Sequence, residues 1–367
     1  MNFFSIFPIT NQNYTMKKTL SFIACSLFIL HAIAQQTITS TISHDGLERE
    51  YILYVPANYT GTTAVPLLFN FHGYTSNAQE QLLYGDFRAI ADTAGFIIVH
   101  PQGTLDGTGA THFNVGWGGS SVDDIGFTAA LIDSLLLDYE IDQTRIYSTG
   151  MSNGGFMSFY LACELSERFA AVGSVTGSMV PATLSNCNAT HQMPIIQIHG
   201  TADGTVPYNG SAGFTASIAS VLSHWATYNN CETPATTTNI PNTNVVDGST
   251  VQKTVYINGD NCSEVVHFKV TNGGHTWPGS AFNFSGTNYD INASIEVWNF
   301  LSRFDINGLI NCSEIATIEE YQLDNSYTIY PNPSNSSIQL KGASQYPLEY
   351  EIFAIDGKLV QKGSIIY

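Results

Sequence analysis

The sequence has 367 residues, 44% of them hydrophobic and 12% aromatic, which is typical of a globular protein with a sizeable core and excludes wholesale disorder. Only 12 residues are Lys or Arg against 30 that are Asp or Glu, so the net charge is −18. A field of that sign repels polyanions, and we therefore expect no nucleic-acid partner.

Residues 1–34 have the pattern of a secretory signal segment. Two lysines follow Met16, an apolar run extends from Leu20 to Ile33, and Ala32-Ile33-Ala34 matches a small-x-small cleavage site. We expect Met16 to be the true start and the mature protein to be secreted or held at the cell surface. The apolar run is shorter than the ~20 residues of a membrane-spanning helix, so we expect no membrane anchor in the mature form.

Strand and helix patterns alternate over residues 35–305. Apolar runs predict strands at Tyr51–Val55, Pro66–Phe71, Phe96–His100, Arg145–Thr149, Ala170–Val175, Pro194–His199, Val251–Ile257 and Val265–Val270. Helical spacing predicts helices at Leu82–Ala94, Ile125–Tyr139 and Phe214–Tyr228, one beginning at Asn153, and a last one at Ile291–Phe304. This alternation predicts an α/β fold with a mostly parallel sheet covered on both faces. We expect the Thr- and Asn-rich segment Pro234–Thr250 to be a surface loop.

The composition changes after this unit. We expect a linker at 306–325, and at 326–367 a small β-module with alternating strands and an Asp356-Gly357 turn.

Disulfides can form in an exported protein, because the environment outside the cytoplasm is oxidising. Several pairings of the cysteines are possible, and our preferred hypothesis joins Cys163 to Cys187 and Cys231 to Cys262, with Cys312 unpaired. No spacing of Cys and His suits a zinc site, and we expect neither a metal nor a cofactor.

A nucleophile motif stands between a predicted strand and a predicted helix. Gly150-Met151-Ser152-Asn153-Gly154 matches G-x-S-x-G, in which flanking glycines allow a sharp turn that exposes the serine hydroxyl. The motif alone is weak evidence for a nucleophile, and its position between a predicted strand and a predicted helix strengthens that evidence. Ser152 is therefore the candidate nucleophile, with a glycine-rich surface turn as the structural alternative.

A serine nucleophile needs a base that is oriented by an acid, and on this type of fold the order along the chain is serine, acid, histidine. Asp203 follows the strand that ends at His199, and His275 lies in a glycine-flanked loop after Val265–Val270. Both side chains should emerge at the carboxyl edge of the sheet, near Ser152. We expect His267 to occupy a surface strand position, and His72 and His199 to pack in turns near the site.

Further residues are candidates for the oxyanion hole and for substrate contacts. The backbone amide of Asn153 and that of Tyr74, in His72-Gly73-Tyr74, would bind the oxyanion. Trp117 and Trp277 would line a cleft for an apolar or aromatic group, and ordinary packing is an equal alternative for both.

These segments resemble a known family. Val122–Phe127, Gly150–Gly155, Ile198–Tyr208 and Gly274–Gly279 look like the motifs of the polyhydroxybutyrate depolymerase/feruloyl esterase family. The resemblance covers residues 36–304 and implies an extracellular α/β-hydrolase that acts on carboxylic esters. It maps the family's triad onto Ser152, Asp203 and His275, and its oxyanion loop onto His72-Gly73-Tyr74.

The C-terminal segment is similar to the sorting domain of the type IX secretion system of Bacteroidota. Tyr330-Pro331-Asn332-Pro333 and Ile355-Asp356-Gly357-Lys358 carry this likeness. It implies contact with secretion machinery. The sequence stops at Tyr367, before the last strands of such modules, so we expect a partial module.

The leading hypothesis is a secreted serine esterase that hydrolyses hydroxyalkanoate polyesters or feruloylated polysaccharides through an acyl-enzyme. Acetyl-xylan esterase, peptidase and dienelactone hydrolase activities on the same fold are alternatives. A non-catalytic module that binds polysaccharide is the alternative from another class.

Overall fold

The structure, a computed structural model, describes residues 35–312, 328–330, 339–341, 348–353 and 359–365. The expected signal segment and most of the expected linker lie outside these residues. Within the described part of the chain, no helix is both long enough and apolar enough to cross a membrane.

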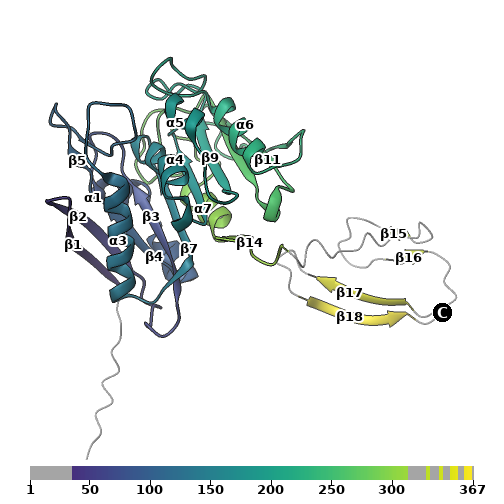
Figure 1. Ribbon diagram of the computed structural model, residues 1–367. Helices are drawn as coiled ribbons and strands as arrows, with labels where there is room; N and C mark the ends of the chain where they lie inside the picture. Colours follow the sequence, from purple (N-terminus) through teal and green to yellow (C-terminus); the bar gives the residue numbers. More distant parts are fainter. Residues whose placement is uncertain (1–34, 313–327, 331–338, 342–347, 354–358, 366–367) are drawn as a thin grey trace, which may run out of the picture.

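A ten-stranded sheet forms the centre of the molecule (Figure 1). Its strands, in spatial order, are β1 (Gln36–His44), β2 (Leu47–Val55), β4 (Ile97–Pro101), β3 (Val65–Phe71), β7 (Ile141–Gly150), β8 (Ala171–Val175), β9 (Ile195–Gly200), β12 (Val265–Thr271), β11 (Thr250–Tyr256) and β10 (Thr236–Asn239). The strands from β4 to β12 run parallel, and antiparallel strands flank them on both sides. The expected α/β fold with a mostly parallel core is confirmed.

Alternating side chains of the central strands supply two separate cores. Leu67 and Phe69 of β3 face one core together with side chains of α3 (Asp124–Asp138), α4 (Asn153–Glu164) and α6 (Ile218–Tyr228). Leu68 faces the opposite core, which also holds side chains of α2 (Arg88–Ala94) and α7 (Ala293–Leu301). A strand that is buried on both faces is mostly apolar, and β3 is apolar except for Asn70, whose amide is hydrogen-bonded. Figure 1 shows α3 and α4 in front of the sheet.

Three elements differ from the expected pattern. The helix expected at Leu82–Ala94 is two helices, α1 (Ala78–Tyr84) and α2, because α1 ends at Gly85, whose carbonyl accepts a bond from Asn70. Strand β1 was not expected. The sequence cue for β1 is Asp45-Gly46, a dipeptide that favours tight hairpin turns. In the structure these two residues have φ of 49° and 75° and form the turn that joins β1 to β2.

The third difference is β10, which lies in the segment expected to be a loop. Its three consecutive threonines are β-branched and suit an edge strand, which pairs here with β11. The short helix α5 (Pro181–Asn186) and one small antiparallel pair, β5 (Thr104–Leu105) with β6 (Thr111–His112), lie outside the ten-stranded sheet.

The continuously described part of the chain extends past α7 to Cys312. The pair β13 (Phe304–Asp305) and β14 (Gly308–Leu309) follows α7, and the amide of Ile306 donates to the carbonyl of Thr144. Two further antiparallel pairs lie in the C-terminal segment: β15 (Thr328–Tyr330) with β16 (Gln339–Lys341), and β17 (Leu348–Phe353) with β18 (Leu359–Ile365).

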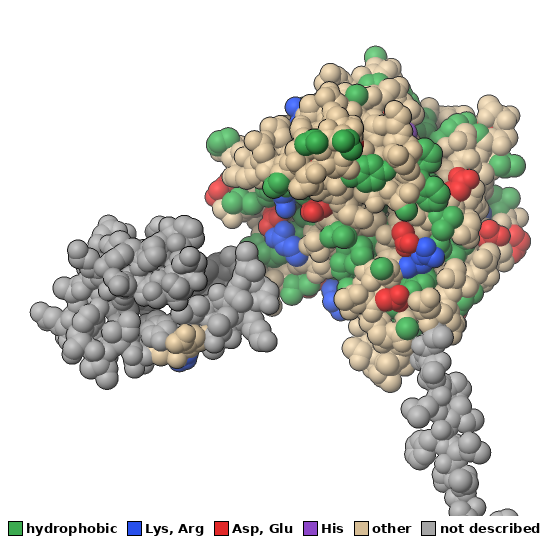
Figure 2. All heavy atoms as spheres, turned by 180° about the vertical axis from the view of Figure 1, so that it is seen from behind, with side chains coloured by type: hydrophobic (Ala, Val, Ile, Leu, Met, Phe, Trp, Pro, Cys, Tyr) green, Lys and Arg blue, Asp and Glu red, His purple; other side chains and the backbone are tan. Residues whose placement is uncertain are grey.

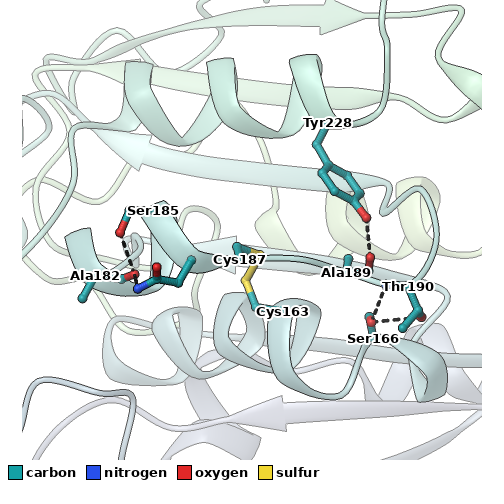
Figure 3. The surroundings of a disulfide bond; sticks show 9 residues. Cys163, Ser166, Ala182, Ser185, Cys187, Ala189, Thr190 and Tyr228 are labelled. Atoms are coloured by element: carbon teal, nitrogen blue, oxygen red, sulfur yellow. Dashed lines mark hydrogen bonds between the residues drawn. A yellow bond between two sulfur atoms is a disulfide. The ribbon is translucent and has the colours of Figure 1, made fainter.

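The described residues form two disulfides, of which one was predicted correctly and the other was not. Cys163 of α4 bonds Cys187 as expected, and Figure 3 shows this bond beside hydrogen bonds from Ser166 to Thr190 and from Tyr228 to Ala189. These contacts fasten the segment after α5 to α4 and to the end of α6.

The second disulfide joins Cys262 to Cys312, and not to Cys231. The reason is the β13–β14 pair, which brings the end of the unit against the turn at Asn261, where a Cβ on Gly308 would lie 2.3 Å from the Asn261 carbonyl oxygen. Cys231 is the unpaired cysteine of the described residues. Its thiol lies 3.7 Å from the carbonyl of Ser263, and burial raises its pKa to about 11.

The surface carries few charges for its size. On the face drawn in Figure 2, acidic and basic side chains lie singly or beside one another among uncharged groups. One charged pair is buried instead: Arg49 Nη2 lies 2.5 Å from Asp124 Oδ1, and this ion pair joins β2 to the start of α3.

Candidate active site

Ser152 lies at a sharp turn between β7 and α4. Its φ of 55° and ψ of −119° are strained for a residue with a side chain, and its amide is held by the carbonyl of Val175 at 2.9 Å. The glycines of the motif have a steric reason. A Cβ on Gly150 would lie 2.6 Å, and one on Gly154 2.1 Å, from the carbonyl oxygen of Phe71. The strand-to-helix turn expected from the sequence is present.

Asp203 and His275 form a hydrogen-bonded pair. His275 Nδ1 lies 2.7 Å from Asp203 Oδ2, and because a carboxylate only accepts, the proton is on Nδ1 and Nε2 is left to accept. The amides of Thr205 and Val206 donate to Oδ1 at 2.9 and 2.8 Å. Burial raises the pKa of Asp203, but the bonds from His275 and Val206 outweigh it and the pKa is lowered. The acid therefore stays ionised.

Ser152 and His275 line one cavity of about 570 Å³. Among the contacts of residues 35–312, no hydrogen bond within 3.5 Å yet joins the Ser152 hydroxyl to His275. Apo sites are often looser than sites with a bound substrate, so such a gap does not disqualify a base. The structure thus pairs the acid with the base and brings base and serine to one cavity.

Two backbone amides beside Ser152 are available to a ligand. Asn153 is the first residue of α4, where a helix leaves its amide unpaired, and neither this amide nor that of Tyr74 donates to another described residue. The loop of Tyr74 is close to the serine, because a Cβ on Gly73 would lie 3.4 Å from the Cβ of Ser152. These are the two amides expected to bind an oxyanion.

Comparisons with known proteins place this site in context. Residues 124–238, which include Ser152 and Asp203, match the phospholipase/carboxylesterase family. The chain is 27% identical over 281 residues to a bifunctional acetylxylan esterase/xylanase of Neocallimastix patriciarum, covering 76% of this chain and 36% of that protein. It is 33% identical over 174 residues to the "Probable feruloyl esterase C" of Aspergillus clavatus, covering 45% and 58% of the two chains. The chain thus spans between a third and three fifths of the length of these two relatives.

The chain has the α/β-hydrolase fold, and its sequence is similar to those of esterases. A solved acetyl xylan esterase from Aspergillus awamori is also similar, with a TM-score of 0.49, 15% identity, and coverage of 73% of this chain and 99% of that one.

Buried polar side chains hold the Gly73–Tyr74 loop and the start of α4. His72 is buried and donates through Nδ1 to the Gly73 carbonyl at 2.7 Å, while Nε2 accepts from the Gly103 amide at 2.9 Å. Burial lowers the pKa of His72 to about 4, so the ring is neutral and can do both. The side chain of Asn153 bonds both the amide and the carbonyl of Phe113, at 2.7 and 3.0 Å.

Two other histidines are buried, His199, which supports the Asp203 loop, and His267. His199 donates through Nε2 to the carbonyl of Val206 at 2.9 Å, and thus fixes the residue whose amide binds Asp203. His267 was expected on the surface and is only 3% exposed. It lies on the central strand β12, where it bonds the Gln197 carbonyl at 2.9 Å and the Tyr208 hydroxyl at 2.8 Å, because α6 covers this face of the sheet.

The two candidate tryptophans of the hydrolase lie apart. Trp277 lines the cavity, donates to Ser294 Oγ at 3.1 Å and packs edge-on against Phe87. Trp117 does not line this cavity. It donates to the Phe214 carbonyl at 3.1 Å and packs on the ring of Phe156.

Several cavity residues were missed by the sequence analysis. One group lies on and before α1, and the other on the loop after His275; they are Ser76, Glu80, Leu83, Tyr84, Ser280, Phe282 and Phe284. Glu80, Leu83 and Tyr84 have helical spacing, and Phe282-Asn283-Phe284 is an aromatic pair in a polar loop. Either pattern is too common to mark a site until the fold places it beside Ser152. No group of His, Cys, Asp or Glu in the described part of the hydrolase is arranged to hold a metal ion.

Proposed function

We propose that this hydrolase cleaves carboxylic esters through a serine acyl-enzyme. The observation that carries the proposal is the shared cavity, which holds the strained Ser152 together with a histidine already paired to a buried carboxylate at 2.7 Å. In such an arrangement His275 Nε2 takes the proton of Ser152 as its oxygen attacks the ester carbonyl.

The remaining steps use the same groups. The amides of Asn153 and Tyr74 hold the negative oxygen of the tetrahedral intermediate, and the imidazolium then gives its proton to the leaving alcohol. Water replaces the alcohol, loses a proton to His275 and attacks the acyl-enzyme. Ser152 is regenerated with release of the acid, so no cofactor takes part in the proposed cycle.

For the substrate we propose feruloylated polysaccharides or hydroxyalkanoate oligomers. The feruloyl esterase and acetylxylan esterase relatives and the aromatic cavity wall support an ester of a plant polymer. Acetylated xylan is therefore the second candidate, and peptidase or dienelactone hydrolase activity the third. Rates on methyl ferulate, hydroxybutyrate oligomers and acetylated xylan, measured side by side, would rank them.

We also propose that the protein acts outside the cell. Two disulfides in the hydrolase unit are compatible with export, and the predicted signal segment supports it. The proposed secretion machinery would recognise the C-terminal segment. Fusion of residues 326–367 to a reporter protein tests this directly, and a reporter that stays inside the cell contradicts it.

The experiment that tests the chemistry uses a fluorophosphonate probe and a p-nitrophenyl ester. We expect the probe to label the native chain at Ser152 and Ser152→Ala to abolish both labelling and hydrolysis while the circular dichroism spectrum is kept. Labelling of another residue, or undiminished turnover by the variant, contradicts the proposal. A chain that binds polysaccharide but neither labels nor hydrolyses is the non-catalytic alternative.

A further inference from the structure

One wall of the cavity is a face of α1. Glu80, Leu83 and Tyr84 all line the cavity that holds Ser152. Their spacing of three and four residues places them on one side of the helix. The loop after His275 contributes Trp277 and Phe282 to the same cavity, and the Trp277 ring lies beside the end of α1, where a Cβ on Gly85 would be 3.3 Å from it. Glu80 is the single carboxylate among the residues that line this cavity.

The Glu80 carboxylate is oriented but not neutralised. The hydroxyl of Ser76 donates to Oε2 at 2.7 Å and lies 3.4 Å from the hydroxyl of Tyr84. Oε1 accepts no hydrogen bond from the described residues, and none of their Lys, Arg or His nitrogens lies within 4.0 Å of it. No Lys or Arg lines the cavity either. A bound molecule therefore meets an oriented carboxylate with one free oxygen.

His275 must protonate the leaving oxygen, so we place the alcohol beside His275. We place the acyl group on the side of Gly73: a Cβ there would lie 3.4 Å from the Ser152 Cβ and 4.0 Å from the Tyr84 hydroxyl. Ser76 joins that hydroxyl to the Glu80 carboxylate, so Glu80 lies on the same side. This assignment rests on the proposed function.

We propose that Glu80 determines specificity for the acyl group. It accepts a hydrogen bond from a hydroxyl on the acyl group and disfavours acyl groups that end in a carboxylate. A charge-assisted hydrogen bond favours the first class, and repulsion between like charges opposes the second, although solvent weakens this repulsion because Glu80 is exposed. Hydroxylated aromatic acyl groups combine such a donor with an apolar body that Leu83 and Tyr84 can cover.

Three methyl esters that differ only at the far end of the acyl group test this proposal: methyl 4-hydroxycinnamate, methyl cinnamate and methyl 4-carboxycinnamate. We expect kcat/KM of the native protein to fall in that order. In Glu80→Gln the value for the carboxylate ester, relative to methyl cinnamate, should rise about tenfold, and in Glu80→Lys it should rise further and reverse the order. Added salt should reduce the native discrimination, because it screens the repulsion at this exposed wall.

Glu164→Gln is the matched control, because Glu164 is exposed at the end of α4 and does not line the cavity. It makes the same change of charge and should leave all three ratios at their native values. Equal ratios in native protein, Glu80→Gln and Glu80→Lys overturn the role of Glu80 while leaving ester hydrolysis established. Failure of the native protein to cleave methyl cinnamate, p-nitrophenyl esters and the other two esters overturns the proposed function itself.

Discussion

The floor and the rim of the cavity are built differently. We use floor for the residues that hold Ser152, His275 and the Gly73–Tyr74 loop in place. Among them, Asp203 and His72 do not line the cavity themselves: Asp203 is 5% exposed and accepts three hydrogen bonds, and His72 is fully buried. On the rim, Phe282 is 43% and Phe284 58% exposed, and the centroids of their two rings lie 6.2 Å apart. Side chains on the floor are held in one position by several partners, whereas rim side chains are held by few.

This difference separates two tasks of the site. Proton transfer and oxyanion binding need fixed distances, and buried hydrogen bonds supply them. Selection among esters needs apolar surface that a substrate can cover, and exposed rings supply it. We therefore expect floor substitutions to change the rate for every ester, and rim substitutions to change only the preference among esters.

The largest effect is expected for Asp203→Asn. The amide cannot hold His275 in the tautomer whose Nε2 accepts a proton, and kcat should fall by about 10⁴-fold, as in serine proteases with the same change. The loss should be equal for small and large esters. Asp138→Asn, at an exposed position at the end of α3, is the control and should keep native kcat. A loss that depends on the ester would place Asp203 in substrate recognition instead.

The second effect concerns the turn below Ser152. In Gly154→Ala the new methyl group would lie 2.1 Å from the Phe71 carbonyl oxygen, which is fixed in β3 and cannot move aside. We expect a loss of about 3 kcal/mol in the free energy of unfolding, measured by urea denaturation, and reduced activity on all esters. Gly107→Ala meets no atom within 4 Å and should be neutral. Native stability in Gly154→Ala would show that the turn is less confined than the contacts indicate.

Part of the floor could be predicted from the sequence because its residues follow strand ends, whereas His267, which lies within β12, was wrongly expected on the surface. Ser152, Asp203 and Tyr74 come directly after β7, β9 and β3, and parallel strands bring their carboxyl ends to one edge. The rim could not be predicted, because Phe282 and Glu80 reach the cavity only through the course of a loop and the turn of a short helix. The Cys262–Cys312 disulfide was also missed, because Cys312 reaches Cys262 only through the turn of the β13–β14 pair.

Buried histidines near the floor make the stability of the fold depend on pH. His267 has its pKa lowered by burial from 6.5 to about 4, so the folded state excludes a proton that the unfolded state binds below pH 6.5. This contribution to stability is complete above pH 6.5 and is lost as the pH falls toward 4. Between pH 7 and pH 5 it amounts to about 2 kcal/mol.

Replacement of this ring removes the pH-dependent contribution. His267→Gln should be less stable than the native protein at pH 7, yet lose about 2 kcal/mol less between pH 7 and pH 5, by urea denaturation at both values. Parallel losses in the two proteins would show that His267 is protonated in the folded state, and would make this part of the floor more hydrated than its 3% exposure indicates.

The smallest effect is expected at the rim. Since the alcohol half of an ester should lie beside His275, Phe282→Ala with Phe284→Ala removes apolar surface that only a large alcohol covers. We expect kcat/KM for 1-naphthyl acetate to fall about tenfold, chiefly through KM, and that for ethyl acetate to change by less than about twofold. Leu137→Ala, at an 88% exposed position on α3, should change neither. An equal fall for both acetates would mean that the rings support the position of His275, and the division between a catalytic floor and a selective rim would then be wrong.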